Sequence, residues 1–261
     1  MNSRLLFTIL CTFLGLQISQ AQYIGQPLNT DRPGFTYTPM TVGQGIWQWE
    51  SGFEYNRRDT ENFGDVRSWG LNGHLRYGVL ETLEVMVSIY WTDFKTFISD
   101  SSFVQAGLNT PEVALRWNIL DGESGPSLGL FANVGFSTLS SKDFESNEIS
   151  SNVIGTFSIP VGERSSIGSN AGLTFFKESE ESIFRATLNY SYAVSDYISV
   201  YGEWFGRFSE FTESNIIDGG VVLNFNSNLM ADFEIGFDVS GNDTPFYILG
   251  GFGYRFGKRV Y

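Results

Sequence analysis

Charged side chains of both signs recur at alternate positions in several segments of this 261-residue chain. His74 and Arg76 lie on either side of Leu75, and Glu84 follows Leu83. In a β-strand, successive side chains point to opposite faces, so such segments carry one charged face and one apolar face. If the apolar face meets lipid, the charged face lines an interior. The predicted interior set is Glu50, Glu54, His74, Arg76, Glu84, Glu112, Arg116, Arg185, Glu203, Arg207, Glu234 and Arg255.

An interior of this kind is compatible with two kinds of chemistry. The charges can pair with one another and hold a packed wall together, or they can line a narrow water-filled path that selects a solute by its charge. The sequence leaves both alternatives open. The arginines of the set would attract anions if they stood above one another as a ladder, and they are Arg76, Arg116, Arg185, Arg207 and Arg255.

The residue types give little support for catalysis. A serine nucleophile needs a base to remove its proton, and His74 is the only histidine of the chain. No serine lies two residues after His74, which is the spacing in the barrel phospholipases, so a hydrogen-bonded interior histidine is the favoured interpretation. Asp232, Glu234 and Asp238 share one strand face, but without a glycine-rich loop or a histidine they are a weak indication of calcium. We predict no catalytic residue, no metal site and no cofactor.

The charged side chains can share one face only if they lie on β-strands. The final predicted strand shows the alternating pattern most clearly. From Phe246 to Phe256, every second residue is apolar, aromatic or glycine. The length suits a tilted strand crossing a bilayer, about 9–11 residues. Twelve alternating segments are predicted, at approximately 46–56, 66–78, 82–93, 110–119, 126–138, 150–160, 165–177, 183–194, 197–208, 216–225, 229–239 and 246–256.

The positions of the aromatic residues and the connections indicate a membrane barrel. Aromatic residues gather near strand ends on the apolar faces, as in the interfacial girdles of outer-membrane barrels. A soluble sandwich or propeller would not need them there. Long connections, such as 57–65 and 94–109, alternate with short ones, such as 79–81 and 226–228. The predicted fold is all-β: a transmembrane antiparallel β-barrel of 12 strands, with short periplasmic turns, longer extracellular loops and both termini on the periplasmic side.

The chain before the first strand divides into two parts. Residues 1–21 have the pattern of a signal peptide, with Arg4, an apolar stretch and a cleavage site at Ser19–Ala21. Residues 22–45 contain three prolines and are irregular; they are predicted to be either a flexible periplasmic arm or a plug folded into the lumen. Residues 46–261 form the predicted barrel. These features predict export to the bacterial outer membrane.

The composition limits the partners. With a formal net charge of −13, the chain cannot neutralise a run of phosphates, so nucleic acid is not a predicted partner. The predicted location implies contact with outer-membrane lipid and lipopolysaccharide, and with the barrel-assembly machinery during biogenesis. A small-molecule solute is the predicted ligand of the lumen. The sequence predicts no particular oligomeric state.

Three short motifs open the predicted mature chain: Thr30–Gly34, then Val42–Gly45, then Glu50–Phe53 inside the first strand. In this order they resemble the opening of a family of bacterial outer-membrane proteins named for the meta-pathway of phenol degradation. The remainder of the chain resembles the family only in architecture. Gly34 departs from the family pattern, in which a polar residue is commoner after the proline.

The resemblance implies an outer-membrane transporter of small organic compounds, and it does not identify phenol as the substrate. The predicted function is therefore a channel or transporter-like barrel for small organic solutes, aromatic ones among them. The first alternative is a closed-lumen structural or surface-interaction barrel, which an interior packed shut by arginine–glutamate pairs would favour. The second is an outer-membrane lipid-hydrolysing enzyme, which loss of that activity in His74→Ala would favour.

Overall fold

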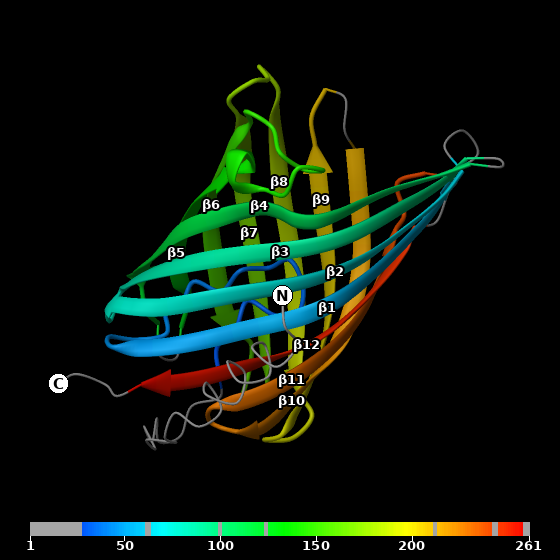
Figure 1. Cartoon of the computed structure of the whole chain (residues 1–261). Coiled ribbons are helices and arrows are strands. Elements are labelled where there is room, and N and C mark those ends of the chain that lie inside the picture. The colour runs from blue at the N-terminus through cyan, green and yellow to red at the C-terminus, as the bar shows by residue number, and fades with distance from the viewer. Residues whose placement is uncertain are drawn as a thin grey trace, which may run out of the picture.

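A closed antiparallel barrel of twelve strands forms the computed structural model of the chain, in which each strand pairs with the next and β12 pairs with β1 (Figure 1). This confirms the predicted all-β, 12-stranded fold. The strands are β1 (Ile46–Thr60), β2 (Gly64–Leu80), β3 (Leu83–Ile98), β4 (Ser101–Leu120), β5 (Ser127–Phe136), β6 (Ile149–Pro160), β7 (Ser165–Phe176), β8 (Ser182–Ala193), β9 (Ile198–Phe208), β10 (Glu213–Asn226), β11 (Leu229–Asp238) and β12 (Phe246–Gly257).

The described part of the chain comprises 28–60, 64–98, 101–122, 125–210, 213–241 and 245–257. The predicted signal peptide and the first residues of the predicted arm, at 22–27, lie outside it. One short 3₁₀ helix, η1 (Ser137–Leu139), occurs in the long connection between β5 and β6. Among the described residues, no helix is long and apolar enough to cross a bilayer.

The first four strands are longer than the alternation predicts. Figure 1 shows them sweeping together to a narrow tip beyond the neighbouring strands. Much of the predicted connections 57–65 and 94–109 is strand, because the β1–β2 ladder continues to Thr60 and Gly64 and the β3–β4 ladder runs to the ends of both strands. Beyond the bilayer both faces of a strand meet water, so the apolar alternation that marks a membrane strand is lost while the backbone ladder persists.

The outer face of the barrel is apolar. Leu71 and Leu188 are 54% and 55% exposed. Trp69 lies between two aromatic rings, with centroid distances of 5.0 Å to Phe53 and 4.4 Å to Tyr55. A continuous apolar surface of this kind is unfavourable in water and suits contact with lipid tails. Closure of the strand ladder leaves no unpaired edge, which is the condition for strands to cross a membrane.

The interior is mainly polar and charged. Gln48, Glu50 and Arg76 are fully buried within it. Its one apolar cluster among the described residues comprises Met86, Ala114, Phe131 and Ile154, against which Tyr37 packs. Figure 1 shows the blue trace of the chain before β1 folded within the ring of strands. The protein therefore places charge inside and apolar side chains outside, the reverse of a soluble barrel.

Candidate functional site in the barrel lumen

Residues 28–45, which we call the lumen segment, lie inside the barrel without forming strand or helix. The segment enters beside β12, where Leu28 lies against Gly253. It then crosses the lumen and returns to the start of β1. The backbone N–H of Thr38 donates to the Asp31 carboxylate at 3.2 Å, which joins the outgoing and returning halves of this loop.

Acidic side chains of the barrel wall bind the backbone of the lumen segment where it crosses to the far wall. The N–H of Gly34 donates to Glu234 at 2.6 Å. The N–H groups of Phe35 and Thr36 donate to the two oxygens of Glu203 at 2.6 and 3.0 Å. A buried backbone without secondary structure must find such partners for its N–H groups. Glu234 and Glu203, both predicted interior acids, therefore hold the lumen segment at this crossing.

Further wall residues form hydrogen bonds with the backbone of the returning half of the lumen segment. Asn170 accepts a hydrogen bond from the N–H of Tyr37 at 2.7 Å and donates to its carbonyl at 3.0 Å. Glu84 accepts from the N–H of Val42 at 2.9 Å. These contacts come from β7 and β3, on different sides of the barrel. The lumen segment is therefore tethered around the circumference of the wall.

Two buried arginines connect the segment to a carboxylate network. Arg76 donates to Glu50 and to Glu84, each at 2.7 Å. Arg116 forms an ion pair with Asp31. Burial alone would raise the pKa of Asp31, but the charges of Arg116 and Arg76 outweigh burial and hold that pKa below its ordinary value. Some of the charged side chains on the lumen-facing side of the strands are thus paired with the lumen segment or with one another.

Arg32 is the cation that the lumen segment itself contributes. Its guanidinium donates to Asp232 at 3.2 and 3.0 Å and to the Asn72 side chain at 2.9 Å. Gly52 on β1 and Gly251 on β12 are directly opposite each other in the ladder that closes the barrel. A Cβ on either glycine would overlap the Arg32 guanidinium. The paired glycines therefore provide the space in which Arg32 lies.

Aromatic rings of the segment pack on rings of the wall. Phe35 stacks on Phe205 with a centroid distance of 4.4 Å and meets Tyr247 edge-on at 5.9 Å. Tyr37 stacks on Phe131 at 4.4 Å. Each stacked pair adds roughly 0.5–1.5 kcal/mol to the burial of the rings. The crossing of the lumen is thus fixed by apolar contact as well as by charge.

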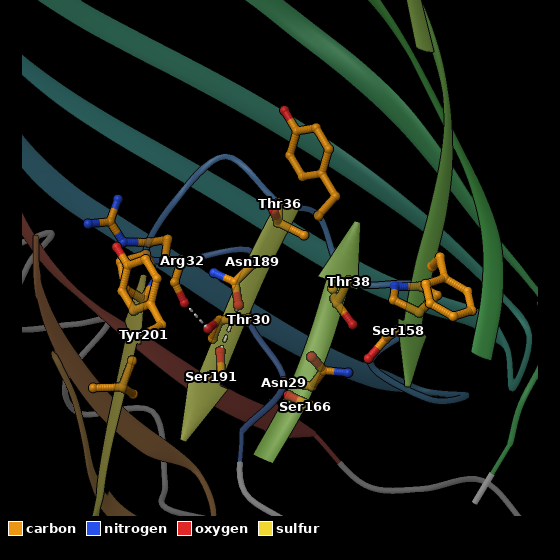
Figure 2. A pocket seen from close by; sticks show the side chains of 16 residues that line it. Asn29, Thr30, Arg32, Thr36, Thr38, Ser158, Ser166, Asn189, Ser191 and Tyr201 are labelled. Atoms are coloured by element: carbon orange, nitrogen blue, oxygen red, sulfur yellow. Dashed lines mark hydrogen bonds between the residues drawn. The ribbon is translucent and has the colours of Figure 1, made fainter. Parts of the chain in front are cut away.

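A pocket of about 220 Å³ lies between the lumen segment and strands β6 to β10. Figure 2 shows hydroxyl and amide groups of the wall around it, among them Ser158, Ser166, Asn189, Ser191 and Tyr201. Sites for drug-sized ligands are larger, roughly 300–1,000 Å³. The pocket therefore has the size and the polarity for a small solute or a group of water molecules.

The predicted arginine ladder is divided into three groups. Arg76 and Arg116 are paired with acids beside the lumen segment, as described above. Arg255 donates to the Ser227 carbonyl and so is held at the connection between β10 and β11. Arg185 and Arg207 lie directly opposite each other on β8 and β9, toward the opposite end of the barrel from Arg255. The sequence identified the shared face but not the heights of the side chains.

The remaining predicted interior acids have partners of their own. Glu54 accepts from the Asn56 amide at 2.6 Å, and Glu112 accepts from the Asn133 amide at 2.8 Å. Neither contact involves the lumen segment. Glu50 and Glu84, in contrast, accept hydrogen bonds from the backbone of the segment.

His74 has a serine partner that the spacing along the chain could not reveal. His74 Nδ1 lies 2.8 Å from the Ser88 hydroxyl, because the two residues are opposite each other on β2 and β3. Ser88 is 1% exposed. Both side chains face the lumen rather than the lipid. His74 is therefore a hydrogen-bonded interior histidine.

Several residues of this site were missed from the sequence. Asn72 and Asn170 occupy the same alternating face as the predicted charges, so applying the face rule to amides would have found them. Asp31 and Arg32 lie in an irregular segment with no periodicity, and only its three-dimensional path reveals their role. Among the described residues, no group of three or more histidine, cysteine, aspartate or glutamate side chains is placed to hold a metal ion.

The barrel is similar to several solved structures. An outer-membrane channel from Pseudomonas putida F1 superposes with a TM-score of 0.63 at 13% identity, covering 86% of this chain and 99% of that chain. The translocator domain of the autotransporter NalP from Neisseria meningitidis gives 0.59 at 11%, covering 83% and 90%. The KdgM porin, solved in complex with disordered oligogalacturonate, gives 0.53 at 11%, covering 78% and 99%. At these identities the likeness shows the outer-membrane barrel fold.

A protein-family model also matches the sequence itself. No curated protein matches the chain significantly. The model of a protein family described as "Putative MetA-pathway of phenol degradation" matches residues 30–256, which span the lumen segment and the barrel almost completely.

Proposed function

The chain belongs to this phenol-degradation family of outer-membrane barrels, and from that premise we propose that it is an outer-membrane channel for small organic solutes whose lumen is constricted by residues 28–45. The barrel wall supplies the path across the membrane, and the lumen segment is a plug within it. The residues proposed to line the solute path are the predicted interior set, with the segment as its narrowest part.

One observation carries the proposal: the segment that crosses the lumen is held by side chains of the wall instead of being part of the wall. Its N–H groups bind Glu234, Glu203 and Glu84, and a polar pocket of about 220 Å³ separates it from β6 to β10. Side-chain contacts can be exchanged for water without breaking the strand ladder. A constriction of this kind can therefore move while the barrel stays intact.

The same contacts also support a second candidate, the closed structural barrel. Arg76 and Arg116 are fully or almost fully buried, at 0% and 1% exposure, and their acidic partners fill the lumen beside the segment. If the segment never leaves this position, the arginine and glutamate pairs hold a closed wall. The two candidates differ in whether removal of the segment opens a path.

The experiment is single-channel conductance of the purified, refolded protein in planar bilayers, with and without residues 22–45. We expect small or infrequent steps from the full chain and larger, stable steps after deletion. Folding of both proteins is verified by heat-modifiable migration on a gel. A folded barrel that conducts in neither form would reject the channel and leave the closed structural barrel.

The environment of the proposed channel follows from its outer face. We propose that outer-membrane lipid and lipopolysaccharide contact the apolar belt that includes Leu71, Leu188 and Trp69, and that the barrel-assembly machinery inserts the chain. The ligand of the lumen is a small-molecule solute. Two of the solved structures that share the fold are named as a channel and a porin, which supports passage of solutes as the general role.

A further inference from the structure

Two arginines of β8 and β9 face the lumen as a pair. Arg185 and Arg207 are directly opposite each other on β8 and β9. Among the described residues, neither forms an ion pair, and the Arg185 Nε is buried without a hydrogen-bond acceptor. Like charges directly opposite each other destabilise a strand pair. In a chain with a formal net charge of −13, a positive pair without an ion-pair contact to a described acid requires an explanation.

Three other acids of the lumen form no ion pair with these two arginines. Glu112 is near enough for its charge to interact with that of Arg185, but its hydrogen bond comes from Asn133, at 2.8 Å. Asp238 accepts from Ser214 at 2.8 Å and lies 3.9 Å from Arg58. Glu54 is bound by Asn56. None of these three acids forms an ion pair with Arg185 or Arg207, whereas Arg76 and Arg116 on other strands are paired with acids at close range.

Aromatic rings lie directly beside the arginine pair. The Arg185 Cζ atom is 5.5 Å from the centroid of Tyr37 and 5.2 Å from that of Phe205. Phe35 stacks on Phe205, so the rings continue from the wall into the lumen segment. Arg207 is exposed on the inward face. A solute that enters from this end therefore meets an accessible cation beside a half-buried cation among aromatic rings.

A guanidinium group binds a carboxylate through parallel hydrogen bonds, and aromatic faces accept flat rings. We propose that Arg185 and Arg207, with Tyr37 and Phe205 beside Arg185, form a binding site for the carboxylate of a flat organic anion at the outer end of the lumen. This inference rests on the proposed channel and names its solute class: aromatic carboxylates rather than neutral hydrocarbons. The site lies directly on the lumen segment, so a bound anion would contact the plug.

The test is equilibrium binding of benzoate to the folded, detergent-solubilised full-length barrel by titration calorimetry. Benzyl alcohol is the neutral probe of similar shape, and cyclohexanecarboxylate is the anion without a flat ring. We expect benzoate to bind more tightly than either probe. Loss of charged hydrogen bonds in Arg185→Gln/Arg207→Gln should weaken benzoate binding by about tenfold or more. Arg67→Gln, which removes an exposed cation on the outer face, should bind benzoate like the wild type.

Equal binding of benzoate and benzyl alcohol by the wild-type barrel would overturn the inference, and that comparison does not depend on the folding of any variant. Unchanged benzoate affinity in the folded double variant would overturn it as well. The test is separate from the test of the channel. A barrel that conducts ions but does not prefer benzoate keeps the proposed function and loses this site, and a barrel that binds benzoate but never conducts loses the channel alone.

Discussion

Arg32 in the lumen segment and Asp232 on β11 form a two-point ion pair, in which Nε donates to Oδ2 at 3.2 Å and Nη2 donates to Oδ1 at 3.0 Å. Their side chains are 6% and 0% exposed. A buried ion pair of this kind stabilises a protein little more than an apolar contact in the same place would. Loss of one partner, however, leaves an unpaired buried charge, which is strongly destabilising. The position of the segment therefore depends on both residues together.

Arg32→Ala should release the lumen segment. The change leaves Asp232 unpaired in the interior, at a cost of about 3–5 kcal/mol for the attached state of the segment. We expect larger or longer conductance steps than in the wild type, from a barrel that still shows heat-modifiable migration. Glu163→Ala, in the exposed connection between β6 and β7, is the control. Wild-type conductance from folded Arg32→Ala would mean that Arg32 does not hold the constriction.

Gly52→Ala should act through Arg32. A methyl group on Gly52 would overlap the Arg32 guanidinium, so the segment must shift and conductance should rise toward the level of Arg32→Ala. Adding Gly52→Ala to Arg32→Ala should change little further, because the space is then free. The control is Gly250→Ala, whose Cβ would have no neighbour nearer than 3.5 Å. Equal effects of the two glycine substitutions in the wild-type background would contradict this mechanism.

Glu203→Ala should loosen the crossing of the lumen. The substitution leaves the N–H groups of Phe35 and Thr36 without their acceptor, at about 1–3 kcal/mol for each buried donor. Hydrogen exchange of these two amides should accelerate by about tenfold or more. Glu54→Ala removes an acid that binds Asn56 away from the segment and should leave this exchange unchanged. Slow exchange at both amides in Glu203→Ala would show that other groups hold the crossing.

Acidification should weaken the segment through Asp31. Its pKa lies below the ordinary value because Arg116 and Arg76 outweigh burial. A depressed folded-state pKa gives stabilisation that is present above the ordinary pKa and is lost as the pH falls through the folded-state value. Conductance should therefore rise in this acidic range.

Asp31→Asn isolates the contribution of Asp31 to that response. The amide cannot carry the charge, so the variant should already conduct more at neutral pH and should change less on acidification than the wild type. The measurement is conductance against pH for the two proteins in the same lipid. Identical pH profiles for the two proteins would show that Asp31 does not cause the acid response.

Much of the wall could be predicted from the sequence because a strand has a period of two. That period separates lipid-facing Leu71 and Leu188 from lumen-facing Glu50 and Arg76 without any knowledge of the fold. It also predicted the number of strands, because each crossing of the bilayer repeats the alternation. The alternation did not predict the outer parts of β1 to β4. Beyond the bilayer, water lies on both sides of the strand, so neither face needs to be apolar.

The contents of the lumen could not be predicted in the same way. Height along the barrel depends on the register between neighbouring strands, which sets Ser88 beside His74 and Arg207 beside Arg185. The lumen segment has no period, and its backbone groups are satisfied by residues far away in the chain, such as Glu203 and Glu234. The sequence therefore left open whether the segment was an arm or a plug, and whether the arginines acted as one ladder.

The glycine pair beneath Arg32 also bears on the order of assembly. Gly52 belongs to the first strand and Gly251 to the last, and these two strands become neighbours only when the ring of strands closes. The space for the guanidinium does not exist in an open sheet. The lumen segment precedes the barrel in the chain. The site that holds its Arg32 is nevertheless complete only after β1 and β12 have paired. Protection of residues 30–36 from protease during refolding therefore reports closure of the barrel, and a trapped open sheet leaves this stretch accessible.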